Sequence, residues 1–262
     1  MKRIIALVLA ALMLIGMTAC ASKNDSESDM AYIKDKGTMI VGITDYAPMN
    51  YKDDSGEWIG FDTELTLAVA EKLGVEVEFI EISWDNKEFE LDAKSIDCVW
   101  NGMTLTDGVK EAMETSEAYL TNAQVVVMSA DAVANYTTIE SLADLTFAAE
   151  AGSAGEAALK DNNLNCTAVS TQANALLEVA AGSVDACVID SVMAGAMTGA
   201  GTSYEDLGIG IALVAEEEYG IGFRKGSDMA AEVDAIIAEL EAEGVVAEIA
   251  EKYNLTNSLI AG

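Results

Sequence analysis

Polar residues follow two strand-like segments that resemble each other. Residues 95–101 (SIDCVWN) and 183–190 (SVDACVID) both begin with Ser-x-Asp and continue as an apolar run. Asn101 and Thr104 lie at or just beyond the end of the first run, and Asp190 ends the second. An amide and a hydroxyl can bind polar ligand atoms, and a carboxylate can bind a cation. Because ligands of open α/β sheets bind beyond the carboxyl ends of strands, these segments predict two walls of one cleft.

Alternating strand and helix patterns are expected to position these polar residues. Residues 39–43 and 75–80 have the apolar patterns of strands. Between them, residues 62–74 carry apolar residues at four-residue spacing, with Asp62 as a predicted N-cap and Gly74 at the end. This alternation predicts an α/β fold with mostly parallel sheets.

The composition argues against several classes of protein. The formal net charge of −31 repels phosphate backbones, so nucleic acid is not an expected partner. The absence of histidine removes the commonest general base, a Ser-His triad and the usual kind of zinc site. The segment around Ser153, Ala-Gly-Ser-Ala-Gly, does not match a Gly-x-Ser-x-Gly nucleophile elbow. We therefore expect no enzyme activity, no metal and no cofactor.

The first residues have the layout of a secretion signal. Lys2 and Arg3 precede an uncharged apolar run that is short for a membrane span. The run ends in Met-Thr-Ala-Cys, which resembles a bacterial lipoprotein box with Cys20 as the lipidated residue. This predicts a signal peptide over residues 1–19 and a polar tether over residues 20–30. The alternative is an ordinary secretion signal in which Cys20 is incidental.

The remaining cysteines do not suggest a disulfide framework. With Cys20 assigned to lipid, an odd number is left, namely Cys98, Cys166 and Cys187. Cys98 and Cys187 sit in the two apolar runs described above. We expect both to be buried thiols that pack like small apolar side chains.

Several short motifs occur in an order that resembles one family. They are Val41-Gly42, Asp45-Tyr46-Ala47-Pro48-Met49-Asn50-Tyr51, Gly60-Phe61-Asp62, Asn101-Gly102-Met103-Thr104-Leu105-Thr106, Gly152-Ser153, Val184-Asp185-Ala186 and Tyr219-Gly220-Ile221-Gly222-Phe223-Arg224-Lys225-Gly226. With these residues the chain resembles the polar amino acid solute-binding proteins of bacterial ABC importers, which are type II periplasmic binding proteins.

The resemblance implies two Rossmann-like lobes joined by two hinge crossings. Lobe 1 would comprise residues 31–128 and 217–262, and lobe 2 residues 129–216. The crossings would lie near residues 125–130 and 209–215, and the lobes would close around the ligand by hinge bending. The family further implies a protein outside the cytoplasm, expected to be a monomer, which delivers its ligand to a membrane permease. The lipoprotein box at Cys20 would hold this protein at the membrane by lipid.

The resemblance also assigns roles to aromatic residues. Tyr46, in the motif that begins at Asp45, falls where the family places an aromatic ring over the ligand side chain. Trp84 falls where the opposite ring is common, so the two rings would sandwich an apolar, planar or cationic group. Plain core packing is the alternative for both rings.

The polar ligand contacts follow from the same comparison. Asn101, Gly102 and Thr104 match the segment that offers backbone and hydroxyl groups to the amino and carboxylate ends of the ligand. Ser153 matches a hydroxyl that meets the carboxylate at a helix start, and Asp190 matches the acidic anchor of the ligand ammonium. For Ser153 and Asp190 the alternative role is that of a helix N-cap.

One departure from the family pattern concerns the anion contact. An Arg usually follows Thr106 by three residues and binds the ligand carboxylate, but Val109 stands at that position. Lys110 is next and is a candidate substitute, although adjacent helical residues point in different directions. A second hydroxyl of the family is also replaced, by Ala154.

These residues leave three functions to compare. The leading hypothesis is capture of an amino acid or an amino-acid-like cation for an ABC importer. A binder of a small amine or quaternary ammonium compound without an α-carboxylate is the alternative that Val109 suggests. A periplasmic dehydratase-like enzyme is the least favoured, because such chemistry needs the anion clamp that the chain lacks.

Overall fold

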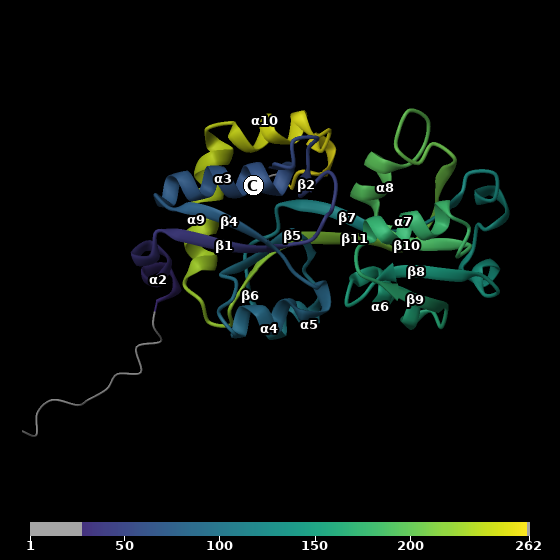
Figure 1. Ribbon diagram of the computed structural model, residues 1–262, viewed down its shortest axis with the longest axis horizontal. Coiled ribbons are helices and arrows are strands. Elements are labelled where there is room, and N and C mark those ends of the chain that lie inside the picture. Colours follow the sequence, from purple (N-terminus) through teal and green to yellow (C-terminus); the bar gives the residue numbers. More distant parts are fainter. Residues whose placement is uncertain (1–27, 261–262) are drawn as a thin grey trace, which may run out of the picture.

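The computed structural model describes residues 28–260, which form two lobes lying side by side (Figure 1). One large sheet runs through both lobes in the order β4-β1-β5-β11-β7-β10-β8-β9, and β6 pairs with β11 outside this path. The α/β class with two lobes is as predicted. The predicted signal peptide and Cys20 lie outside the described residues.

Lobe 1 is built on three parallel strands. β1 (Thr38–Ile43) pairs with β4 (Glu76–Glu81) on one side and with β5 (Cys98–Thr104) on the other. Helices α3 and α10 lie on one face of these strands, and α4 and α5 lie on the opposite face (Figure 1). The remaining elements of this lobe are α2 (Asp29–Lys36), β2 (Tyr51–Lys52), β3 (Trp58–Ile59), α3 (Phe61–Leu73), η1 (Trp84–Asn86), α4 (Lys87–Asp92), α5 (Asp107–Ala112), β6 (Glu114–Thr115), α9 (Met229–Ala242), α10 (Val245–Lys252) and η4 (Thr256–Ser258).

Lobe 2 repeats the plan with three further parallel strands. β8 (Thr146–Glu150) pairs with β10 (Ala186–Asp190) and with β9 (Asn165–Val169). Glu150 and Asp190 are the last residues of their strands, so their side chains lie at the same edge of the sheet. The remaining elements of this lobe are η2 (Val133–Asn135), η3 (Ile139–Leu142), α6 (Ala154–Asp161), α7 (Gln172–Ala180) and α8 (Ser191–Met197).

Two long antiparallel strands connect the lobes. β7 (Leu120–Ser129) and β11 (Leu207–Phe223) pair along most of their length, with register shifts between residues 209 and 217. At one end β11 pairs with β5 of lobe 1, and residues 124–128 of β7 pair with β10 of lobe 2. The chain therefore passes between the lobes inside continuous strands. The crossing predicted at residues 125–130 falls on residues that already belong to the sheet of lobe 2.

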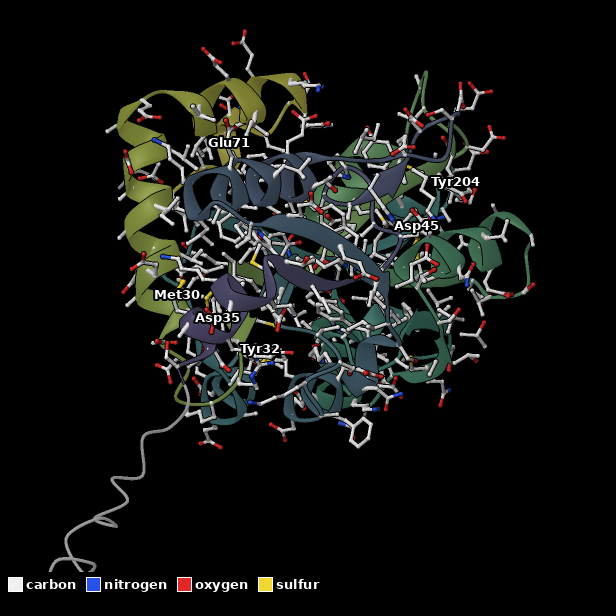
Figure 2. All side chains as sticks on the ribbon, turned by 60° about the vertical axis from the view of Figure 1, so that its left-hand side comes forward. Met30, Tyr32, Asp35, Asp45, Glu71 and Tyr204 are labelled. Atoms are coloured by element: carbon white, nitrogen blue, oxygen red, sulfur yellow. The ribbon has the colours of Figure 1, made fainter. Side chains whose placement is uncertain are left out.

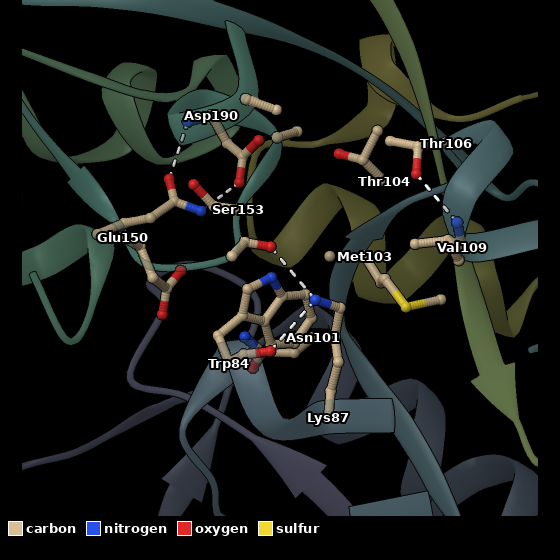
Figure 3. A pocket seen from close by; sticks show the side chains of 15 residues that line it. Trp84, Lys87, Asn101, Met103, Thr104, Thr106, Val109, Glu150, Ser153 and Asp190 are labelled. Carbon is tan, nitrogen blue, oxygen red and sulfur yellow. Dashed lines mark hydrogen bonds between the residues drawn. The ribbon is translucent and has the colours of Figure 1, made fainter. Parts of the chain in front are cut away.

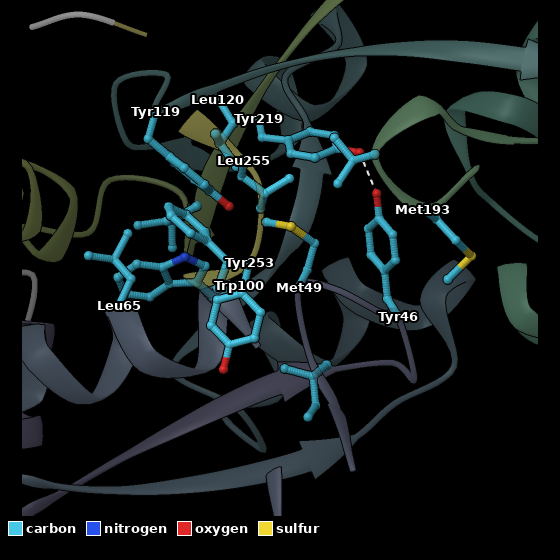
Figure 4. Packing of buried hydrophobic residues seen from close by; sticks show 14 of the residues in the cluster. Tyr46, Met49, Leu65, Trp100, Tyr119, Leu120, Met193, Tyr219, Tyr253 and Leu255 are labelled. Carbon is cyan, nitrogen blue, oxygen red and sulfur yellow. Dashed lines mark hydrogen bonds between the residues drawn. The ribbon is translucent and has the colours of Figure 1, made fainter. Parts of the chain in front are cut away.

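Buried aromatic side chains fill the core of lobe 1. Trp100 and Tyr219 are fully buried and belong to the core. Figure 4 shows Trp100 packed with Tyr253 and Leu65, while Tyr46 points toward Tyr219. These two tyrosine hydroxyls are 2.6 Å apart and share a hydrogen bond.

Helix α3 corrects one prediction. Gly60, rather than Asp62, occupies the N-cap position, and the Asp62 carboxylate is buried. It accepts hydrogen bonds from the Gly102 amide (2.6 Å) and the Tyr119 hydroxyl (2.9 Å). Burial raises the pKa of Asp62 to about 7, although both bonds lower it. The prediction was wrong because the Asp62 carboxylate binds the Gly102 amide of β5, and the local sequence does not show that this amide lies beside it.

The described cysteines are free, and two of them are buried. Cys98 and Cys187 are buried and free, as predicted, and burial raises the pKa of both thiols. Cys166 is free and partly buried. Within residues 28–260, no helix combines the length and the apolar character needed to pass through a bilayer.

Candidate functional site

A cavity of about 150 Å³ lies between the two lobes. Figure 3 shows Glu150, Ser153 and Asp190 on one side of it and Thr104, Thr106 and Val109 on the other. Its wall combines polar and charged side chains with apolar surface, to which Trp84, Met103 and Val109 contribute. The residues that line the cavity include Trp84, Lys87, Asn101, Gly102, Thr104, Val109, Glu150, Ser153, Gln172 and Asp190.

Asp190 is the most strongly held carboxylate of the cavity. It ends β10, is 4% exposed, and accepts hydrogen bonds from the side-chain amides of Asn122 (2.6 Å), Gln124 (2.5 Å) and Gln172. It stands at the N-cap position of α8, but its side chain makes no capping bond. Burial raises its pKa, and the three amides oppose this rise. The carboxyl group is thus fixed in place on the cavity wall, where its ionised form can bind a cation.

Ser153 caps a helix, as one of its two predicted roles requires, and lies on the cavity wall. Its hydroxyl caps α6 by accepting a hydrogen bond from the Glu156 amide (3.1 Å). The same residue lines the cavity. The first turn of α6 therefore begins at the cavity wall, where its amides favour an anion.

Lys87 is a cavity residue that the sequence analysis missed. It begins α4, is 7% exposed, and its ammonium donates to the carbonyl oxygens of Trp84 and Gly152, each at 3.2 Å (Figure 3). The ammonium also lies 4.9 Å from the centroid of the Trp84 ring. Burial lowers its pKa, and the carboxylates of Glu88, Glu150 and Asp85 raise it. An ammonium has three donors, so one remains for the cavity.

Glu150 is the second residue that was missed. It ends β8 as Asp190 ends β10, and it is 2% exposed. The pKa of Glu150 is raised to about 8. Burial is the largest cause and the charge of Asp190 adds to it, while Lys87 opposes the rise. The sequence signal for Glu150 is its place at the end of the strand before Ser153, because ligands of open α/β sheets bind beyond strand ends.

The apolar wall contains both Trp84 and Val109. Trp84 opens the short helix η1 and is buried against Val109 in one apolar cluster. Val109 lies in α5, where its amide donates to the Thr106 hydroxyl (3.2 Å). The residue that replaces the family's Arg therefore does face the cavity, and it presents a methyl surface there. Lys110 is exposed and does not line the cavity, so the structure does not support it as the substitute.

The segment 101–104 of β5 forms the floor of the cavity. The Asn101 side chain is committed to the interior, donating to Thr44 and accepting from Asn50, both at 2.8 Å. Its contribution to the cavity is therefore mainly backbone. Gly102 has a φ of +55°, and the Thr104 hydroxyl donates to Glu217 (3.3 Å).

Two predicted ligand contacts, Tyr46 and Asp45, do not line this cavity. Tyr46 is 1% exposed and packs behind Gly102, with its hydroxyl on Tyr219. The Tyr46 ring does not line the cavity. It packs against Gly102 of β5, where a side chain would leave no room for the ring. Asp45 is exposed and lines a separate cavity with Ser170. Figure 2 shows Asp45 on the outside of the molecule, near Tyr204.

The described residues offer no clear place for a metal ion. Within residues 28–260, no group of three or more Cys, Asp or Glu side chains is arranged to hold one. The two cavity acids instead face an ammonium and several amides. The site is chemically suited to bind a charged small molecule by hydrogen bonds and ion pairs.

The sequence over residues 39–256 matches the family described as bacterial extracellular solute-binding proteins, family 3. The chain belongs to this family. It is therefore an extracytoplasmic solute-binding protein, as its motifs predicted. The arginine-binding extracellular protein ArtP of Bacillus subtilis (strain 168) is 30% identical over 265 residues, which covers 97% of this chain and 98% of ArtP.

Solved structures of this family share the two-lobed fold. A mutant of ArgBP from T. maritima has a TM-score of 0.80 and 29% identity, covering 86% of this chain and 98% of the other. The ancestral amino acid-binding protein AncCDT-1, described as a precursor of cyclohexadienyl dehydratase, has a TM-score of 0.78 and 29% identity, covering 86% and 99%. All three relatives are thus named as binding proteins, including the one related to an enzyme.

Proposed function

We propose that this protein captures an amino acid for an ABC importer, in the cavity between its lobes. The observation that carries the proposal is the pair of opposite charges on one cavity. The Asp190 carboxylate comes from lobe 2 and the Lys87 ammonium from lobe 1. A zwitterionic α-amino acid presents the complementary pair, with its ammonium for Asp190 and its carboxylate for Lys87 and the start of α6.

The proposed capture involves closure of the two lobes. Lobe 1 and lobe 2 both line the cavity, and Lys87 reaches from α4 to the carbonyl of Gly152 in lobe 2. Bending would occur where β7 and β11 pass between the lobes, near residues 121–123 and 213–218. The register of β11 is irregular close to this point, which supports a hinge there.

A second candidate is a ligand without an α-carboxylate, such as a small amine or quaternary ammonium compound. Val109 favours it, because a methyl surface stands on the cavity where an Arg would bind a carboxylate. Lys87 favours the amino acid. Calorimetric titration with an amino acid and with its decarboxylated amine separates the two, since only the first uses an anion contact.

The cellular setting follows from the family and from the predicted signal. We propose a monomer tethered outside the cytoplasm by lipid on Cys20, which presents the closed, loaded form to a membrane permease. Such a protein needs no cofactor. The strongly acidic surface keeps it soluble and carries no information about the ligand.

The direct test combines ligand identification with one substitution. Mass spectrometry of small molecules released from the purified protein should find an amino acid. In calorimetry, Asp190→Ala should bind that amino acid at least about tenfold more weakly, because a buried charged contact is lost. Asp161→Ala is the control, since Asp161 is an exposed carboxylate of lobe 2 outside the cavity. Equal affinity of both variants would remove Asp190 from the site.

A further inference from the structure

Glu150 is a buried acid of the cavity that the capture of a plain amino acid leaves without a role. It is 2% exposed, yet its Oε1 atom has no hydrogen-bond partner among the described residues. Asp190, in contrast, accepts hydrogen bonds from three side-chain amides. Buried polar atoms in proteins usually have partners. Glu150 lines the cavity, and its Oε1 atom is an acceptor that the described residues leave unused.

The charges around Glu150 are unbalanced when it is ionised. Asp190 and Asp85 repel its charge, and the buried Lys87 attracts it. Asp190 and Glu150 together carry two negative charges and Lys87 carries one positive charge, so the cavity is left with one excess negative charge. The Lys87 ammonium is already bound to two carbonyl oxygens, which limits how far it can neutralise Glu150.

We propose that Glu150 binds a second cationic group of the ligand, so that the ligand is an α-amino acid whose side chain ends in an ammonium or a guanidinium. This inference rests on the proposed function, because Asp190 and Lys87 then hold the two ends that every α-amino acid shares. A ligand of this class has a net charge of plus one, which balances the excess charge of the cavity. A carboxylate paired with a cation makes stronger hydrogen bonds than a neutral pair.

Matched ligands test the proposal by calorimetric titration of the purified protein. Arginine and citrulline have nearly the same shape, but citrulline has a neutral urea in place of the guanidinium. Lysine and norleucine form a second pair for a cavity that accepts an ammonium. The wild type should prefer the cationic member of at least one pair by about tenfold or more, the effect of one charged hydrogen bond.

Substitutions then assign this preference to one side chain. Glu150→Gln keeps the shape and removes the charge, so the preference should shrink by about tenfold while the affinity for the neutral ligand stays within about threefold. Asp85→Asn is the matched control. It removes an exposed carboxylate near Glu150 that does not line the cavity, and the preference should stay within about threefold of the wild type.

The outcomes separate this inference from the proposed function. If the wild type binds cationic and neutral amino acids equally, or if Glu150→Gln keeps the preference, Glu150 does not select the ligand and amino acid capture still stands. If no free amino acid binds at all, both proposals fail together.

The wild type alone gives an independent measurement in case Glu150→Gln does not fold. Burial raises the pKa of Glu150 to about 8, so binding of a second cation near pH 7 should release a proton from it. Titrations in buffers of different ionisation enthalpy measure the release directly. Binding of arginine or lysine near pH 7 without proton release would overturn the inference.

Discussion

Polar groups and an aromatic ring surround the buried ammonium of Lys87. Two carbonyl oxygens accept its hydrogen bonds, and the face of Trp84 lies close by. Burial lowers the pKa of Lys87, and neighbouring carboxylates restore part of it. The same lysine thus offsets some of the negative charge that Glu150 and Asp190 bring to the cavity.

Replacement of Lys87 should affect amino acids more than amines. Lys87→Met keeps the apolar stem and removes the ammonium, so the affinity for an α-amino acid should fall by about tenfold or more. The corresponding decarboxylated amine should lose less, because it makes no contact with an anion partner. Calorimetry with both ligands measures the two losses.

A matched control exists for Lys87. Lys225 also donates to two carbonyl oxygens, those of Lys110 (2.8 Å) and Met113 (2.9 Å), but it does not line the cavity. Lys225→Met should leave the affinities for both ligands within about threefold. Equal losses of both ligands in Lys87→Met would show that Lys87 is no carboxylate partner.

The raised pKa of Glu150 predicts a pH dependence of stability. Its pKa is about 8 in the folded protein and 4.5 in its ordinary state, so the folded chain binds more protons between these values. The free energy of unfolding of the ligand-free protein should therefore fall as the pH rises through this window. Denaturant unfolding at about pH 5.5 and about pH 8.5 should show a larger fall for the wild type than for Glu150→Gln, on the order of a few kcal/mol. Parallel curves for the two proteins would contradict the assignment.

Residue patterns predicted part of the cavity and missed the rest for identifiable reasons. Trp84, Ser153 and Asp190 do line it, although their contact with ligand stays a prediction. Tyr46 does not, because its burial depends on the space that Gly102 leaves, which sequence spacing cannot show. Lys87 was missed because a lysine at a helix start looks like a solvent-exposed residue until Gly152 from the other lobe is placed beside it.

At the scale of elements, the contact between β5 and the strand β11 depends on a residue without a side chain. Gly102 has a φ of +55°, in the left-handed region, and a Cβ there would lie 2.6 Å from the Tyr46 ring and 3.1 Å from the Tyr219 ring. Its amide also donates to the buried Asp62 in α3. The part of β5 that lines the cavity at Gly102 is thus held in place by contacts with Tyr46, Tyr219 and Asp62.

Gly102→Ala should destabilise the fold for two separable reasons. The backbone conformation is strained for any residue with a Cβ, and the new methyl overlaps two buried rings. Gly182→Ala is the control, because Gly182 has a φ of +71° but open space around it. Denaturant unfolding should show Gly102→Ala to be less stable than Gly182→Ala by about 1–3 kcal/mol, the usual cost of overpacking. An equal loss would mean that the rings move aside.

The spacing of apolar residues predicts where strands and helices lie better than it predicts which strands pair with each other. The predicted strand at residues 39–43 is β1, the one at 75–80 is β4 within one residue, and Gly74 ends α3 in a left-handed conformation. The lengths of β7 and β11 could not be read in the same way. Each strand changes its pairing partners along its length, and local periodicity does not show where one partner replaces another.

At the scale of the whole molecule, the predicted lipid anchor on Cys20 determines whether the protein stays at the membrane. Cys20 lies outside the described residues, and its lipidation rests on the sequence motif alone. In the native organism, Cys20→Ser should move the protein from the membrane fraction to the soluble extracytoplasmic fraction. Immunoblotting of the fractions measures this, with Cys166→Ser as a control that should stay at the membrane. A Cys20→Ser protein that remains with the membrane would remove the lipid anchor from the proposal.

The bond between Lys87 and the Gly152 carbonyl joins the two lobes, and under the proposed closure it exists only when they are together. Such a bond shifts the equilibrium of the empty protein toward the closed population. Because observed affinity scales with the fraction of molecules that are competent to bind, this pre-organisation strengthens the binding of every ligand alike. The same bond also makes transport less selective, because a permease that recognises only the closed form would bind closed molecules without ligand.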